Sequence, residues 1–156
     1  MATSITVQQF LDESRLPFEL VTHPHSSTSL QSAKAAHIEP FQMAKAVLLE
    51  EHGQLVMALL PATKHLHLGT LRRQFKREFG MATEQTVRQI FCDCEPGAIP
   101  ALGGAYGIET IWDDSLMNSA DLYFEAGDHE HLVRLRTEDF LEFVRECQHG
   151  EFSVPL

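Results

Sequence analysis

Two apolar segments separated by a short turn constrain this chain more than any other feature. Residues 44–50 read AlaLysAlaValLeuLeuGlu, residues 54–60 read GlnLeuValMetAlaLeuLeu, and GluHisGly lies between them. Two such segments joined by a short glycine-containing turn are typical of a β-hairpin. Because both segments are largely apolar, we expect these strands to be buried in the protein interior.

The remaining elements are predicted from capping residues and apolar spacing. Helices are expected to begin at four capping residues, Thr6, Thr28, Thr83 and Thr137. A basic helix is expected over about 70–78, and a long Gly- and Pro-rich loop over 92–104. Further strands are expected at 18–21, 64–68, 106–112, 121–126 and 131–136. Consecutive strands mixed with helices predict an α/β (α+β) fold around a mostly antiparallel or mixed sheet.

Length and composition indicate one soluble domain. The chain has 156 residues, 44% of them hydrophobic, and it contains no repeat or linker, so we expect a single domain over 1–156. The N-terminus lacks a basic segment followed by an apolar one, and every unbroken apolar run, AlaValLeuLeu at 46–49 among them, is far shorter than the ~18 residues needed to cross a bilayer. These features predict no export signal and no membrane partner, and hence a cytoplasmic protein. The oligomeric state is open between a monomer and a weak dimer.

The charge distribution limits how a nucleic acid could bind. The net charge is −10, which disfavours wrapping a long duplex because phosphate binding depends on Lys and Arg. Four of the twelve basic residues nevertheless fall in one short segment, Arg72, Arg73, Lys76 and Arg77. This segment is either a solvated helix face or a small patch that guides one end of a nucleic acid.

The cysteines and histidines give little support for a metal centre. Cys92, Cys94 and Cys147 are odd in number and lack the spacing of a zinc site, so we expect reduced thiols. His65 and His67 share one face of a predicted strand, without an evident third ligand. No GxSxG motif is present, so a serine hydrolase is not supported. We therefore predict no metal and no cofactor.

Lys45 and two other features are candidates for chemistry. Lys45 lies in the first apolar strand between two alanines, where partial desolvation would strengthen its attraction for an oxyanion. An ordinary lysine whose stem lies along the sheet edge is the alternative. The 97–104 loop holds three glycines, which suits backbone N–H groups that face a ligand, although a plain connecting loop has the same composition. His129 follows a Gly-Asp turn, and His23 ends another strand.

Six stretches, taken in order along the chain, form a recognisable set. They are ThrHisProHisSerSerThrSer at 22–29, MetAlaLysAlaValLeuLeu at 43–49, LeuLeuProAlaThrLysHisLeuHisLeu at 59–68, CysGluProGlyAlaIlePro at 94–100, AspAspSerLeu at 113–116 and GluAlaGlyAspHis at 125–129. This set resembles the YbaK/ProX family of trans-editing aminoacyl-tRNA deacylases, relatives of the insertion editing domain of prolyl-tRNA synthetase. The resemblance runs from about residue 5 to residue 144.

The resemblance implies a compact fold with a mixed, barrel-like sheet flanked by helices. It implies hydrolysis of the ester that joins a wrong amino acid to the terminal adenosine of tRNA. It makes Lys45 the residue that holds the aminoacyl-CCA end, and His129 a further active-site position. Substrate contacts are expected from His23, Gly97, Ala98, Ile99, Pro100, Gly103, Gly127 and Asp128. Ala46 departs from the Asn or Thr that many members place after the lysine, so the amino acid removed is not carried over.

The sequence therefore predicts a free-standing deacylase of mischarged tRNA. In this hypothesis Lys45 holds the CCA end, the 97–103 loop contacts the amino acid, and His129 orients water or the ribose. The main alternative is a module of the same fold that binds aminoacyl-tRNA or an amino acid without catalysis. A third possibility is hydrolysis of a small ester or thioester unrelated to tRNA.

Overall fold

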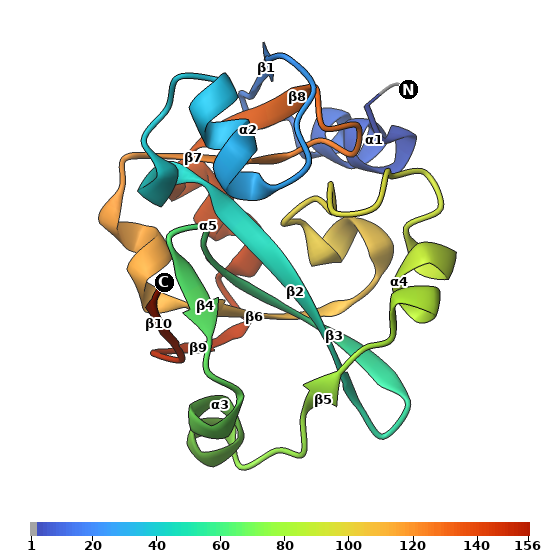
Figure 1. Ribbon diagram of the computed structural model, residues 1–156, viewed down its shortest axis with the longest axis vertical. Coiled ribbons are helices and arrows are strands. Elements are labelled where there is room, and N and C mark those ends of the chain that lie inside the picture. The colour runs from blue at the N-terminus through green and yellow to red at the C-terminus, as the bar shows by residue number, and fades with distance from the viewer. Residues whose placement is uncertain (1–2) are drawn as a thin grey trace.

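The central hairpin has the pairing that the apolar pattern predicts. The computed structural model describes residues 3–156. In it β2 (Ala44–Glu51) and β3 (Gln54–Pro61) pair antiparallel along their whole length. The turn uses two left-handed residues, His52 at φ 49° and Gly53 at φ 79°. Figure 1 shows this hairpin crossing the middle of the molecule.

The strands of residues 3–156 form sheets of five, three and two strands. The five-stranded sheet has the order β5 (Gly80–Met81), β2, β3, β6 (Glu109–Asp113) and β9 (Gln148–Gly150). The three-stranded sheet has the order β1 (Glu19–Thr22), β8 (His131–Arg136) and β7 (Asp121–Glu125). The smallest sheet pairs β4 (Lys64–Leu66) with β10 (Ser153–Pro155). β3–β6 and β6–β9 are parallel and the other pairs antiparallel, so the mixed sheet is confirmed.

The barrel-like sheet that the resemblance implies is not a closed barrel. A single parallel bridge between Met43 and Tyr123 links the start of β2 to β7. Elsewhere in the described chain the larger sheets keep separate hydrogen-bond ladders. β5 is only two residues long and β9 only three, so these edge strands extend the ladder too little to close it.

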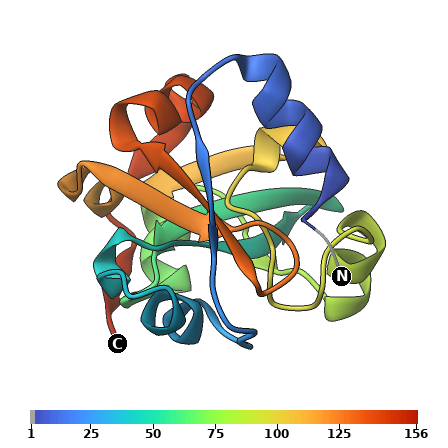
Figure 2. The ribbon, with the colours of Figure 1, turned by 90° about the horizontal axis from the view of Figure 1, so that it is seen from above.

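Helices flank the sheets, as expected. They are α1 (Ile5–Ser14), α2 (Ser29–Ala35), α3 (Leu68–Phe75), α4 (Glu84–Ile90) and α5 (Thr137–Val144), with short 3-10 turns η1 (Pro40–Gln42), η2 (Gly103–Tyr106) and η3 (Asp114–Asn118). Figure 2 shows β1 lying across β8, with α1, α2, α4 and α5 around the rim. No helix of residues 3–156 is long and apolar enough to cross a membrane.

Two of the predicted caps are correct and two are wrong. Thr28 and Thr83 accept hydrogen bonds from the N–H groups three residues later, as N-caps do. The first helix is capped by Ser4, whose hydroxyl accepts from the N–H of Val7, and not by Thr6. Thr137 is the first residue of α5 and its hydroxyl bonds to the carbonyl of Ser119 instead.

The hairpin separates two apolar cores because its side chains alternate between faces. Ala44 and Leu48 of β2 pack into the larger core with Phe124 of β7. Leu49 lies in a second core with Phe79. A third, smaller cluster on that opposite face surrounds Met43, Ala33, Ala62 and Leu132 beneath α2. The loop that follows α4 has no helix or strand until η2, which confirms the predicted long connection.

Candidate functional site

Lys45 is the second residue of β2 and pairs with Leu60 of β3. Its side chain is partly buried, and this burial lowers the pKa of its ammonium below the ordinary 10.5. No carboxylate of residues 3–156 lies within 4.0 Å to form an ion pair with it. A cation with reduced solvation and no protein anion is suited to bind an anionic or strongly polar ligand oxygen.

The bridge between β2 and β7 places the side chains of Lys45 and Glu125 on the same side of these two strands. Met43 and Tyr123 form the parallel bridge, and Lys45 and Glu125 each lie two residues further along their strands. Met43 and Tyr123 both pack into the small cluster beneath α2. Alternation along each strand therefore turns Lys45 and Glu125 toward that same side.

His129 lies in the turn between β7 and β8, with a left-handed φ of 60° and 4% exposure. Its Nε2 lies 2.7 Å from the carbonyl oxygen of Pro96. Because a carbonyl only accepts hydrogen bonds, Nε2 carries a proton and donates it. Its Nδ1 lies 3.1 Å from Oε2 of Glu125. Both ring nitrogens therefore face protein groups, which does not fit the predicted role of His129 in orienting water or ribose directly.

Glu125 is the member of this cluster that sequence reasoning missed. It is 1% exposed at the end of β7, and burial raises the pKa of its carboxyl. The hydroxyl of Ser32 and the imidazoles of His129 and His23 oppose that rise. The contact with His129 is close but not aligned as a hydrogen bond, so within the described part of the chain both carboxyl oxygens lack a fully formed hydrogen bond. A glutamate at a strand end gives no periodic signal, so only the topology could find it.

His23 and the segment after β1 join the same cluster. The backbone N–H of His23 donates to the carbonyl of Glu130, and that of Ser26 donates to the carbonyl of His129. His23 is 4% exposed; its Nδ1 contacts the carbonyl of Pro24 at 2.8 Å, and its Nε2 has no partner among residues 3–156. The structure therefore brings two predicted residues, His23 and His129, together around a glutamate that was not predicted.

The glycine-rich loop reaches this cluster through Gly97. Gly97 has φ +82°, and a Cβ there would lie 3.3 Å from the carbonyl oxygen of Ser27 and 3.5 Å from the His129 ring. Gly97 and Ile99 line a hollow of about 290 Å³ together with Ala46. This hollow is mainly apolar, with further walls from Leu48, Met81, Ala82, Glu84, Val87, Arg88 and Pro96.

The other predicted loop residues are part of the protein interior. Ala98 and Pro100 are buried. Gly103 is buried against the side chain of Thr110, which leaves no room for a Cβ. These three residues pack the loop against the protein interior. Their contact with substrate stays a prediction.

Gly127 and Asp128 form the turn that carries His129. Gly127 has φ +112° and packs against Ser4 and Cys94. Asp128 is fully buried; its Oδ1 accepts the backbone N–H groups of Glu130 and His131. Desolvation opposes ionisation here, but these hydrogen bonds and the His131 imidazole outweigh it and lower the pKa of Asp128. The geometry gives both residues a positional role, and direct substrate contact stays a prediction.

The basic segment lies away from this cluster. It falls on α3 and the turn after it, at the lower end of the molecule in Figure 1, whereas α2 and β1 lie at the upper end. Arg77 donates to Glu51 and Glu109, and its guanidinium stacks 4.6 Å from the Phe79 ring centroid. Arg72 donates through Nε to the Phe79 carbonyl. Two of the four predicted steering residues are thus already engaged by the protein.

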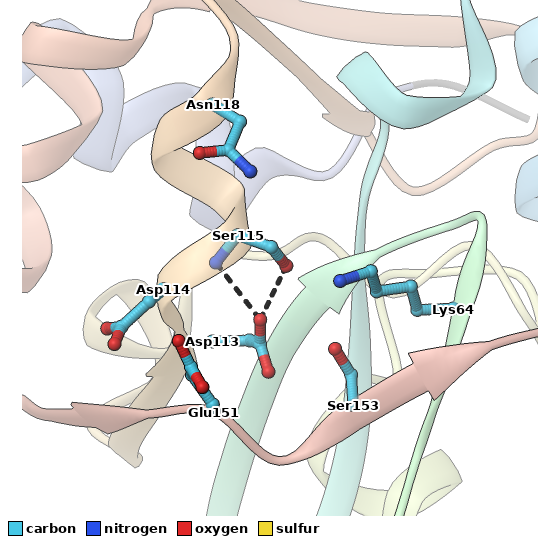
Figure 3. A pocket seen from close by; sticks show the side chains of 7 residues that line it. All are labelled: Lys64, Asp113, Asp114, Ser115, Asn118, Glu151 and Ser153. Carbon is cyan, nitrogen blue, oxygen red and sulfur yellow. Dashed lines mark hydrogen bonds between the residues drawn. The ribbon is translucent and has the colours of Figure 1, made fainter.

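A different hollow, drawn in Figure 3, is lined by three carboxylates and a single lysine. Asp113 is 2% exposed and its carboxylate accepts from the N–H groups of Ser115 and Phe152. Lys64 points into the hollow from β4, opposite Ser153 of β10. An excess of carboxylates repels phosphate, and none of the predicted catalytic residues lies here, so the glycine-lined hollow is the better candidate site.

Comparison with solved structures agrees with this architecture. A provisionally assigned trans-editing enzyme for prolyl-tRNA synthetase superposes with a TM-score of 0.84 at 20% identity, covering 99% of this chain and 98% of that one. Hypothetical protein APE2540 gives a TM-score of 0.82 at 16% identity, covering 96% and 99%. A provisionally assigned signal transduction protein from Marinobacter aquaeolei VT8 gives 0.78 at 18% identity, covering 96% of this chain and 30% of that one. At these identities the likeness establishes the fold.

The fold and the site define a mixed α/β domain with a glycine-lined, apolar hollow, a buried histidine–glutamate cluster that contacts the same glycine loop, and a partly buried Lys45 on the strand that forms one wall of the hollow. The sequence profile of the aminoacyl-tRNA editing domain matches residues 23–143, so the chain belongs to that family. No match was found among curated protein sequences.

Proposed function

We propose that this protein hydrolyses the ester of mischarged tRNA, acting as a free-standing deacylase. The observation that carries the proposal is Lys45, a partly buried ammonium without an ion-pair partner in the described chain. It lies at the start of a strand whose next residue, Ala46, lines the hollow with Gly97. Lys45 holds the oxygens of the terminal nucleotide, which positions the ester beside the glycine-rich loop.

Protein nucleophiles near the site are poorly suited to attack an ester. Burial raises the pKa of Cys94 to about 12, so its thiol is protonated at neutral pH. The Ser26 hydroxyl is buried and hydrogen-bonded to that of Ser32 at 2.6 Å, so it is not exposed to a substrate ester. Water is therefore the nucleophile in this proposal, and the substrate's own ribose hydroxyl helps to activate it. An aminoacyl ester is already reactive, so positioning and a nearby cation suffice.

The apolar hollow receives the amino-acid side chain. Ala46, Gly97 and Ile99 contribute small or aliphatic surfaces, which favours a small apolar side chain over a charged one. One methylene more or less in such a pocket changes binding by only ~1–3 kcal/mol. The pocket therefore selects a class of amino acids rather than one member.

Charged tRNA outside the site is guided by the cations that the fold leaves exposed. The side chains of Arg73 and Lys76 are exposed, whereas Arg77 is hydrogen-bonded to two glutamates. A protein with a net charge of −10 can contact only a limited length of RNA, which fits recognition of an acceptor end. This substrate places the protein in the cytoplasm.

The test is a panel of tRNAs mischarged with amino acids of different size and polarity. We expect the protein to release at least one small apolar amino acid faster than buffer does. Absence of release from every member of the panel would overturn the proposal. Small esters and thioesters run in parallel distinguish a hydrolase that ignores tRNA, since tRNA-dependent turnover is the expected result.

One observation favours a second function, a binding module without catalysis. Both nitrogens of His129 face protein groups, so this imidazole has no nitrogen directed at a substrate to act as a base. Calorimetry separates the two functions: tight binding of an aminoacyl-tRNA analogue by a protein that releases no amino acid would select the binding module.

A further inference from the structure

The buried carboxyl of Glu125 has no part in the function proposed so far. It is 1% exposed, and neither of its oxygens has a fully formed hydrogen bond within residues 3–156. A carboxyl group buried in this way costs free energy unless a neighbour compensates it. The group that approaches it most closely is the His129 ring, with Nδ1 3.1 Å from Oε2.

The protonation state of the ring follows from its other contact. The carbonyl of Pro96 requires a proton on Nε2 of His129. In the neutral ring Nδ1 is then an acceptor, and a protonated Glu125 donates to it. In the charged ring Nδ1 is a donor, and an ionised Glu125 accepts from it. In either of these two forms one proton lies between Nδ1 and Oε2, whereas an ionised Glu125 beside the neutral ring would leave two acceptors 3.1 Å apart that repel each other.

His129 is also the link between Glu125 and the glycine-rich loop. The loop is held beside it at two more points, where the N–H of Glu95 donates to the Gly127 carbonyl and where the Glu95 carboxylate lies 3.6 Å from Nε2 of His25. The ring of His25 packs edge-on against that of His129, with centroids 5.7 Å apart. Gly97 follows Pro96 directly, so the orientation of the His129 ring fixes the backbone at the edge of the hollow.

We propose that Glu125 is a positioning residue, which shares one proton with Nδ1 of His129 and so orients the ring that holds Pro96 and Gly97 at the aminoacyl pocket. Its effect on turnover rests on the proposed deacylase function, whereas its effect on the ring and the loop does not. Other groups near the carboxyl are His23 from the segment after β1, Asp128 from the turn and Ser32 from α2. Lys45 lies on the same face from β2.

The first test is NMR of the full-length protein without tRNA. In the wild type we expect Nε2 of His129 to be protonated and the ¹⁵N shift of Nδ1 to lie between the values of a bare and a protonated nitrogen. In Glu125→Leu we expect Nδ1 to move to the bare value, the Gly97 amide signal to shift, and its hydrogen exchange to accelerate at least about ten-fold. Glu95→Gln is the control for the ring: it removes a carboxylate that touches His25 and not His129, so the Nδ1 shift of His129 is expected to stay at the wild-type value.

Two NMR results would overturn the proposal. One is a His129 ring without a proton on Nε2, and the other is an unchanged Nδ1 shift together with an unchanged Gly97 amide signal in Glu125→Leu. Glu125→Gln keeps a polar side chain and serves if the leucine variant does not fold. It is expected to hold the ring by a neutral hydrogen bond and to retain most of the loop protection, and loop exchange as fast as in an unfolded chain would contradict this.

Turnover then tests the link to function. The substrate is a mischarged tRNA that the wild type deacylates. On it, Glu125→Leu is expected to lower kcat about ten-fold or more with little change in KM, because the loop acts on the reacting ester. A change confined to KM would assign Glu125 to substrate binding and overturn the positioning role. If the wild type deacylates nothing, the NMR results still decide whether Glu125 positions the loop.

Discussion

The imidazole of His129 is hydrogen-bonded to the carbonyl of Pro96, 33 residues away in the sequence, at 2.7 Å. This contact joins the turn after β7 to the glycine-rich loop. The same ring approaches the buried Glu125 on its other side. The candidate site is thus held by a histidine that faces inward, and Lys45 is a partly buried cation without an ion-pair partner among residues 3–156.

Gly97→Ala tests the close approach of the loop to His129. A left-handed alanine costs roughly 1–2 kcal/mol of stability, and the new Cβ would also press on the Ser27 carbonyl and the His129 ring. We expect loss of about that stability in urea unfolding and at least about ten-fold lower deacylation. Gly53→Ala is the matched control, with a similar φ of +79°; beyond its two chain neighbours, no atom of residues 3–156 lies within 4 Å of the added Cβ. Equal activity of the two variants would show that the loop contact is irrelevant to turnover.

The carboxylate of Asp93 should make the free energy of unfolding depend on pH, because it anchors the start of the N-terminal helix. Burial alone raises the pKa of Asp93, but hydrogen bonds from Ser4, Thr6 and Tyr106 outweigh it and lower the pKa to about 2. Because this lies below the ordinary 3.8, the contribution is present above pH 3.8 and is lost as the pH falls toward 2. Asp93→Asn should therefore unfold at roughly 1 kcal/mol lower free energy at pH 7. Urea titrations across this range should show the difference shrinking with acid; a constant difference would refute the assignment.

Arg77 and Arg73 lie in the same basic segment and should behave differently. The Arg77 side chain is 20% exposed and bonded to Glu51 and Glu109, whose hydrogen bonds raise its pKa further. Removing it leaves Glu51 partly buried without its partner, so Arg77→Ala should cost about 2 kcal/mol of stability. Arg73→Ala should leave the melting temperature unchanged and raise KM for tRNA in a salt-dependent way. Thermal melts and kinetics at two salt concentrations check both variants. A destabilised Arg73→Ala, or an Arg77→Ala protein of unchanged stability, would contradict these separate roles.

Lys45 should release its proton at lower pH than an ordinary lysine. Burial disfavours the charged form and lowers its pKa below 10.5. We expect the ¹³Cε signal of Lys45, assigned with Lys45→Met, to titrate with a midpoint under that value. A midpoint at or above 10.5 would indicate a fully solvated or ion-paired ammonium.

Local patterns predicted most of the fold correctly. The hairpin followed from two apolar segments and a glycine turn, and the caps Thr28 and Thr83 followed from short-range hydrogen bonding. The cap Ser4 was missed because its selection depends on Asp93, which is 89 residues away. Strands β5, β9 and β10 are too short to give a periodic signal, so they form only where a neighbouring strand offers a ladder.

The candidate site was predictable only in part. Lys45 and Gly97 stood out by residue type and setting, but nothing in the sequence indicated that His129 turns inward. That orientation depends on Glu125 and Pro96, which are brought together by the β7–β8 turn and the loop. The basic segment was a reasonable steering patch by composition, yet Arg77 is neutralised by two glutamates distant in sequence.

The most direct test of the account is the deacylation rate of mischarged tRNA by the wild type, Lys45→Ala and Lys64→Ala. Lys64 is the matched control, a partly buried lysine on β4 that lines the acidic hollow instead. We expect Lys45→Ala to lose on the order of 100-fold in kcat/KM, equivalent to ~2.7 kcal/mol, and Lys64→Ala to stay within about two-fold of the wild type. A Lys45→Ala protein that turns over at the wild-type rate would contradict the account.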